Sequence, residues 1–314
     1  MEFKYSTSIL TSKFSLIFKI LVYVFCAILL TSVIAACVLI PAERNFSLRS
    51  DVKEETKALK DSWDEFTEGE SGVKSFVDTA AGFIKKIWNI IKLDRVFLAK
   101  ALATIIIFYF VTKFLLTLAS MPLSFMIDQF MSSGLEYGFM SAFFKNIRHS
   151  ALYSLIYTAI MVPTNLLIYT LITVIIIELT PALNMFALTL ALLLAITLFS
   201  LRSTLFCGWL PYFLHSEDKK LFKALRASFK MVKERFNRIL MTMFVVFFLM
   251  YILIVVLGVV TFGLAFIAGM ALLYLILRIL ELTFYYIYNR KNYYIDRNTI
   301  VDSRAIEDRT ELQS

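Results

Sequence analysis

The sequence predicts an all-α membrane protein: a six-span transmembrane helical bundle with interfacial amphipathic helices and an outer helical loop. Hydrophobic residues make up 59% of the 314 residues and charged residues only 18%, and the mean hydropathy is +0.75. Soluble domains contain about 45–50% apolar and about 25% charged residues. A soluble fold would expose much of this apolar excess to water. The excess is also gathered into runs of about 20 residues, the length that crosses the ~30 Å hydrocarbon layer.

Five apolar runs contain the six predicted spans. They cover residues 20–42, 101–127, 151–177, 179–201 and 239–277. The third and fourth spans are separated by the turn residues Thr180 and Pro181. The last run has 39 residues without a charge, and as one helix it would be about 58 Å long, nearly twice the hydrocarbon thickness. We therefore expect it to fold back near Gly258 and Gly263.

The distribution of Lys and Arg predicts that both termini are cytoplasmic and that the protein lies in the cell (plasma) membrane. Residues 219–238 alone hold eight basic residues, and the outer turns near Pro181 and Gly263 hold none. Residues 43–95 are an exception with ten basic residues, but eleven acidic residues offset them. The predicted parts are an inner amphipathic segment with the first span (1–42), an extracytoplasmic helical loop (43–96), five further spans with cytoplasmic amphipathic helices (97–288) and a cytoplasmic tail (289–314).

The first span also resembles an export signal, because Ile34-Ala35-Ala36-Cys37 has the form of a bacterial lipobox. The residues after Cys37 are apolar, whereas a processed lipoprotein turns polar there, so a retained signal anchor is the favoured interpretation. Cys26, Cys37 and Cys207 all lie in apolar runs. This odd set predicts neither a disulfide framework nor a metal site.

Basic segments with helical apolar spacing recur at residues 3–19, 132–149 and 221–238. Such helices lie in the headgroup plane with their cations towards anionic lipid, although a solvated connector can have the same pattern. In the outer loop, residues 51–70 predict an exposed charged helix. Residues 83–97 alternate apolar and basic positions and predict a helix on the outer leaflet.

Residues 209–236 carry a resemblance to a known group. Trp209-Leu210-Pro211 ends a span, Ala224 and Ser228 lie in the following basic helix, and another span begins after Phe236. This pattern resembles a broad group of uncharacterised bacterial multi-pass membrane proteins, which are similar to the membrane domain of some glycerophosphodiester phosphodiesterases. About forty residues carry the resemblance in sequence, and it implies a layout rather than an activity.

Charges inside spans are costly and are therefore candidates for function. Lys113, Arg202 and Arg278 are each predicted about two helical turns above the inner interface, which places three cations at one depth. Simple snorkelling towards the headgroups explains each of them. A more specific hypothesis is that the three cations converge in a pocket that binds an anionic lipid phosphate or another anion. Glu281 lies three residues after Arg278 and can pair with it, and purely structural ion pairs are the third reading.

Pro163 and Asn165 mark a possible transport site in the middle of the third span. Proline removes a backbone hydrogen bond, and transporters place broken helices at mid-membrane to bind substrates. A simple kink, with Asn165 bonded to a neighbouring helix, is the alternative.

The sequence predicts no catalytic residues, no metal site and no cofactor. The two histidines, His149 and His215, have no Cys or carboxylate neighbours at metal-ligand spacing, and none of the common catalytic motifs occurs. The net charge of +8 does not require a nucleic-acid partner. We expect a non-enzymatic protein of the bacterial envelope that engages anionic phospholipid or an unknown protein partner at the cytoplasmic leaflet. The alternative is a small permease that uses a broken third span.

Overall fold

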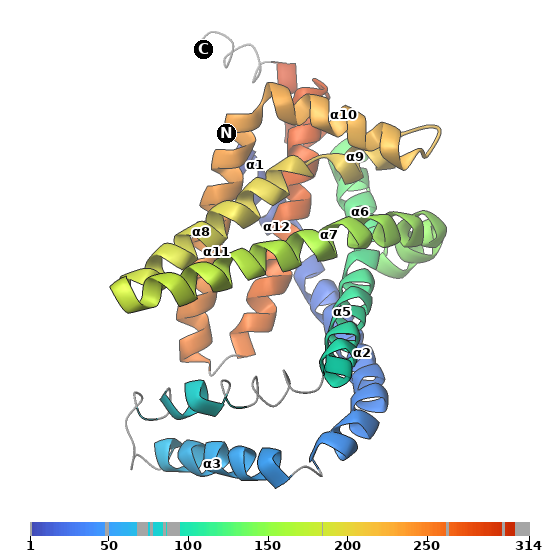
Figure 1. Ribbon diagram of the computed structural model, residues 1–314. Coiled ribbons are helices and arrows are strands. Elements are labelled where there is room, and N and C mark those ends of the chain that lie inside the picture. The colour runs from blue at the N-terminus through green and yellow to red at the C-terminus, as the bar shows by residue number, and fades with distance from the viewer. Residues whose placement is uncertain are drawn as a thin grey trace. The chain divides into compact units, whose positions relative to one another are not determined.

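The computed structural model describes residues 2–47, 50–67, 75, 78–83, 86, 95–183, 185–261, 264–296 and 299–304. These residues are almost entirely helical (Figure 1). The helices are α1 (Glu2–Ser12), α2 (Ser15–Ser47), α3 (Ser50–Thr67), α5 (Arg95–Leu118), α6 (Ser120–Ser133), α7 (Phe139–Leu183), α8 (Met185–Leu205), α9 (Trp209–His215), α10 (Leu221–Glu234), α11 (Phe236–Val260) and α12 (Leu264–Tyr288). Two short antiparallel strands, β1 (Tyr293–Tyr294) and β2 (Ile300–Val301), follow α12.

Six helical segments in this part of the chain are long and apolar enough to cross a membrane, which confirms the predicted fold class. They are Ser15–Ile34, Ala103–Ser133, Phe139–Glu178, Thr189–His215, Phe236–Gly258 and Ala268–Tyr288. The long apolar run divides as predicted, because α11 ends at Val260 and α12 begins at Leu264. The architecture is that of a multi-pass membrane protein.

Helix α7 differs from the prediction at both ends. It begins at Phe139, so the second half of the predicted segment 132–149 is the start of the span rather than a separate interfacial helix. It also continues through Thr180 and Pro181 to Leu183. No Gly or Pro lies between Phe139 and Pro163 to end the helix earlier. The 45 residues give a helix of about 67 Å.

The N-terminal helix α1 packs against the end of α12. The hydroxyl of Ser6 donates a hydrogen bond to Thr283 Oγ1 at 3.3 Å, and Ile9 is fully buried. One face of the predicted segment 3–19 is therefore covered by protein. Phe14 and Phe18, at the end of the same segment, stay exposed.

The residues that carry the family resemblance build a joint between α9 and α10. The indole of Trp209 donates to the carbonyl of Leu221 at 3.0 Å, and the hydroxyl of Ser228 donates to the carbonyl of Cys207 at 2.7 Å. Gly208 begins α9 with φ of +85°, a conformation that residues with a Cβ rarely adopt. The pattern that gives the resemblance thus has a structural role in this chain.

The chain divides into two compact units. The larger consists of Met1–Cys26 and Lys113–Ser314, and the smaller of Ala27–Thr112. In the smaller unit, α3 confirms a helix within the predicted segment 51–70. The predicted outer-leaflet helix 83–97 lies mostly outside the described residues. All site residues discussed below belong to the larger unit.

We expect Gly208→Ala to destabilise the joint by about 1–2 kcal/mol, because the left-handed backbone strains any residue with a Cβ. An added Cβ would also lie 2.6 Å from Met231 Cε, although this flexible side chain can move. Thermal unfolding of the detergent-solubilised protein measures the effect. Gly138→Ala is the control, because no atom lies within 4 Å of its added Cβ. Equal melting temperatures for the two variants would contradict the role of Gly208.

Candidate functional site

Electrostatic interactions connect the three cations for which the sequence predicts one depth. Lys113 comes from α5, Arg202 from α8 and Arg278 from α12. Lys113 has electrostatic interactions with both arginines. Arg278 is buried, with 7% of its surface exposed, and Lys113 and Arg202 are partly buried. We call these three residues and Glu281 the cation cluster.

Glu281 neutralises one of the three cations. Arg278 Nη1 lies 2.6 Å from Glu281 Oε2, and both residues are on α12. The guanidinium also faces the Tyr274 ring at 5.5 Å. Within the described part of the chain, Nε of Arg278 has no hydrogen-bond partner. Arg278 and Glu281, which are three residues apart, therefore form an ion pair within α12. This pair leaves the Nε donor of Arg278 without a hydrogen-bond partner among the described residues.

Arg202 joins the second candidate site to the first. Its Nη1 donates a hydrogen bond to Oδ1 of Asn165 on α7, and Asn165 is only 2% exposed. Pro163 does not belong to this site, because it lies on an exposed face of α7. The helix runs through Pro163 without interruption, so the expectation of a broken third span is wrong.

The cation cluster has an excess of positive charge. Lys113, Arg202 and Arg278 contribute three formal charges, and Glu281 removes one. Among the residues that the structure describes, no carboxylate forms an ion pair with Lys113 or Arg202. Uncompensated charge in an apolar interior is costly. The arrangement can therefore bind an anion, which would supply the missing countercharge.

Helix α7, which carries Asn165, also carries several buried hydroxyl groups. Tyr153 and Tyr157 of α7 interact electrostatically with Arg278. The neighbouring hydroxyls of Ser154 and Thr158 are buried, and neither has a partner among the described residues. Buried polar groups normally have hydrogen-bond partners. These hydroxyls are therefore further groups on α7 that can form hydrogen bonds with a ligand.

A partly buried ion pair that sequence reasoning missed joins α9 to α6. His215 Nε2 of α9 lies 3.2 Å from Asp128 Oδ1 of α6, and the same oxygen accepts a hydrogen bond from the Tyr286 hydroxyl at 2.8 Å. The ring of His215 stacks on Tyr285 at 4.6 Å between centroids. The search for carboxylates at metal-ligand spacing from His215 could not find Asp128, because Asp128 lies on another helix. A single acid at the end of the second apolar run was the available signal.

The pair also affects Lys219, which follows α9. Burial lowers the pKa of Lys219, and the Asp128 carboxylate opposes this effect. The Lys219 ammonium donates to the carbonyl of Leu214 at 2.5 Å. Asp128 thus connects α6 with the end of α9 and, through Tyr286, with α12, and the role that its contacts indicate is structural.

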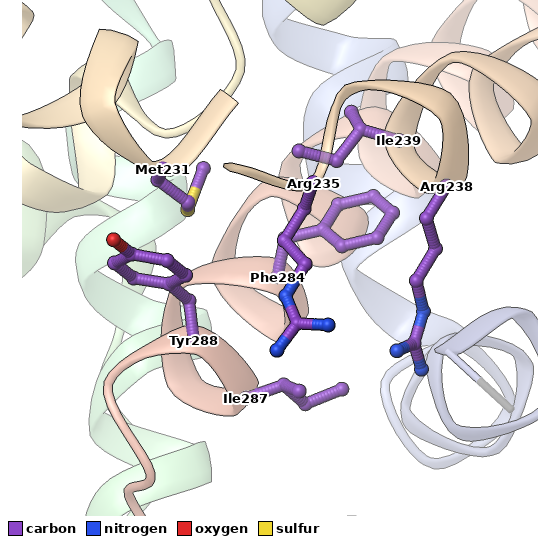
Figure 2. Close-up of a pocket in the computed structure, with 7 residues that line it drawn as sticks. All are labelled: Met231, Arg235, Arg238, Ile239, Phe284, Ile287 and Tyr288. Atoms are coloured by element: carbon purple, nitrogen blue, oxygen red, sulfur yellow. The ribbon is translucent and has the colours of Figure 1, made fainter. Parts of the chain in front are cut away.

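A small pocket lies where α10, α11 and the end of α12 meet (Figure 2). Arg235 passes in front of Phe284, and Arg238 extends in the same direction to one side of it. The Tyr288 hydroxyl at its edge donates to Glu234 Oε2 at 2.6 Å. This pocket concentrates cationic side chains at the end of the basic segment 221–238.

No protein family, curated protein or solved structure matches this chain. The site is therefore interpreted from its own geometry, and the resemblance based on Pro211, Ala224 and Ser228 stays a prediction. Fold and composition define the class as a multi-pass membrane protein.

We expect Glu281→Gln to destabilise the protein by about 3 kcal/mol, because it leaves the Arg278 charge buried without its partner. Replacing both residues together, as Arg278→Met with Glu281→Gln, should cost clearly less than Glu281→Gln alone. Thermal unfolding in detergent, measured by circular dichroism, tests both statements. Glu217→Gln changes an exposed carboxylate and is the control. If the double variant is less stable than Glu281→Gln, the loss of stability in Glu281→Gln does not come from the unpaired Arg278 charge.

Proposed function

We propose that this chain is a non-enzymatic integral membrane protein of the bacterial cell membrane that binds an anionic phospholipid in the cytoplasmic leaflet. The lipid phosphate would lie at the cation cluster. One observation carries the proposal: Lys113 interacts electrostatically with Arg202 and Arg278, and only Arg278 has a carboxylate partner among the described residues.

The physical cost of the cluster supports an anionic ligand. A charged side chain at the centre of a membrane-spanning helix costs at least about 2.5–3.5 kcal/mol. Like charges that snorkel independently would point apart towards the headgroups. Here Lys113 lies within electrostatic reach of both arginines. A phosphate with two or more oxygens matches the forked donors of Arg and the compact charge of Lys.

The position of the cluster along its helices supports a ligand that comes from the bilayer. Lys113 is near the end of α5, which closes at Leu118, and Arg202 is near the end of α8, which closes at Leu205. With both termini cytoplasmic, both helices run towards the inner leaflet, where lipid phosphates are abundant anions. The apolar spans that contain Lys113 and Arg202 continue beyond these helices to Ser133 and His215, so the phosphate would extend inwards to reach the cluster. Lys and Arg placement supports this orientation.

A permease is the second candidate, and Asn165 favours it. A transported anion would meet the same Arg202–Asn165 contact. The two functions differ in outcome, because a lipid stays bound whereas a transported ion crosses the membrane. The hypothesis of a protein partner at the cytoplasmic face predicts neither lipid retention nor flux.

We expect Lys113→Gln with Arg202→Gln to lose a phospholipid that the wild-type protein retains, because the double variant removes both uncompensated cations. Native mass spectrometry of the purified proteins measures the retained lipid. This variant keeps the Arg278–Glu281 pair and therefore preserves the most stability-sensitive part of the site. Lys57→Gln with Lys60→Gln is the charge-matched control, since both lysines are exposed on α3.

Equal lipid retention by the two double variants would overturn the proposal. Anion flux into vesicles that is lost in Asn165→Leu, without retained lipid in the wild type, would establish the permease instead. Size-exclusion chromatography shows whether each variant still folds, so loss of lipid is not confused with loss of structure.

A further inference from the structure

We propose a second phosphate-binding site, at the membrane surface, that holds the headgroup of a glycerophospholipid. It occupies a pocket at the corner of α1, α2 and α6, which we call the corner pocket. Its polar lining comes from Ser12, Lys13, Ser15, Lys19, Glu136 and Tyr137. The site shares no residue with the cation cluster, so the two proposals can fail separately.

A buried lysine forms the floor of the corner pocket. The Lys13 side chain is only 11% exposed. Its Nζ donates to Glu136 Oε1 at 2.9 Å and lies 3.8 Å from the centroid of the Phe130 ring. The cavity has a volume of about 60 Å³, which exceeds the space that a single water needs. A phosphate-sized group is therefore a better match than a larger metabolite.

Positive charge exceeds negative charge around the pocket. Lys19 is exposed at its mouth. Lys145 Nζ lies 5.8 Å from the ring of Tyr137, which lines the pocket. Among the residues that the structure describes, Lys19 and Lys145 form no ion pair, whereas Lys13 is paired with Glu136. The two lysines thus leave two positive charges for an anion.

The surroundings of the pocket favour a lipid over free phosphate. Phe14 and Phe18 are 64% and 72% exposed on the two sides of Ser15, and Leu135, which lines the pocket, is exposed as well. Exposed aromatic and aliphatic side chains beside lysines are typical of the membrane interface. Acyl chains can pack on these apolar side chains while the phosphate enters the pocket. Free phosphate gains nothing from them.

The site also explains why two distant segments carry similar patterns. Lys13 and Lys19 come from the basic segment 3–19, and Lys145 comes from 132–149. Neither segment forms a free interfacial helix, since α1 packs on α12 and residues 139–149 begin α7. The fold instead places Lys13 and Lys19 in the lining of one pocket and Lys145 near Tyr137, which also lines it.

We expect Lys19→Gln with Lys145→Gln to weaken the binding of short-chain phosphatidylglycerol at this site by about 30-fold. This follows from about 1 kcal/mol, or about fivefold, for each lysine near a membrane surface. Native mass spectrometry of delipidated protein, titrated with the lipid, counts the bound molecules. The wild type should bind two at low lipid concentration and this variant one. Both lysines are exposed, so the variant should fold.

The control is Lys4→Gln with Lys230→Gln, which removes two exposed cations from α1 and α10. The control should keep both lipids, and Lys113→Gln with Arg202→Gln should keep the one in the corner pocket. Unchanged binding in Lys19→Gln with Lys145→Gln, or an equal loss in the control, would overturn the proposal. A third result would overturn the lipid assignment. In that case inorganic phosphate stabilises the wild type, this stabilisation is lost in Lys19→Gln with Lys145→Gln, and added lipid does not change it. The ligand would then be free phosphate.

Discussion

The structure depends on how a helical bundle that is apolar almost throughout accommodates a few charges. Arg278 and Glu281 are both more than 90% buried and lie 2.6 Å apart on one helix. Two such charges are tolerated only as a pair, because each alone would carry a large desolvation cost. The pair compensates both charges within α12, and α12 packs against α1, α6, α9 and α11. The remaining cations, Lys113 and Arg202, face a bundle that is already arranged around this pair.

The number of spans could be predicted because length and hydropathy act locally. A helix must satisfy its own backbone in lipid, so each long apolar run becomes a helix whatever surrounds it. Helix ends were less predictable. Pro181 suggested the end of a span, but α7 continues to Leu183, because proline near a helix end removes few hydrogen bonds. Residues 139–149 contain no helix breaker, so the basic segment there continues into α7.

The candidate site could be predicted only in part, for a geometrical reason. Depth along a helix follows from counting residues, and it predicts one level for Lys113, Arg202 and Arg278. Which way each side chain faces depends on the rotation of each helix about its axis, which packing decides. The contact between Arg202 and Asn165, and the pair between Asp128 and His215, both depend on that rotation. No spacing in the sequence links these partners, because they lie on different helices.

The joint between α9 and α10 connects the sequence pattern to the site. Cys207 follows Arg202 by little more than one helical turn, and its carbonyl accepts the hydrogen bond from Ser228 of α10. Cys207 also lies within electrostatic reach of Arg278 and Glu281. The hydrogen bond therefore holds the end of α8 against α10, and Gly208 lets the chain turn immediately after Cys207. Because Arg202 is on that last part of α8, the direction of its side chain towards Asn165 depends on the joint. Residues outside the cation cluster thus orient Arg202, since the packing that ends α8 also directs this side chain.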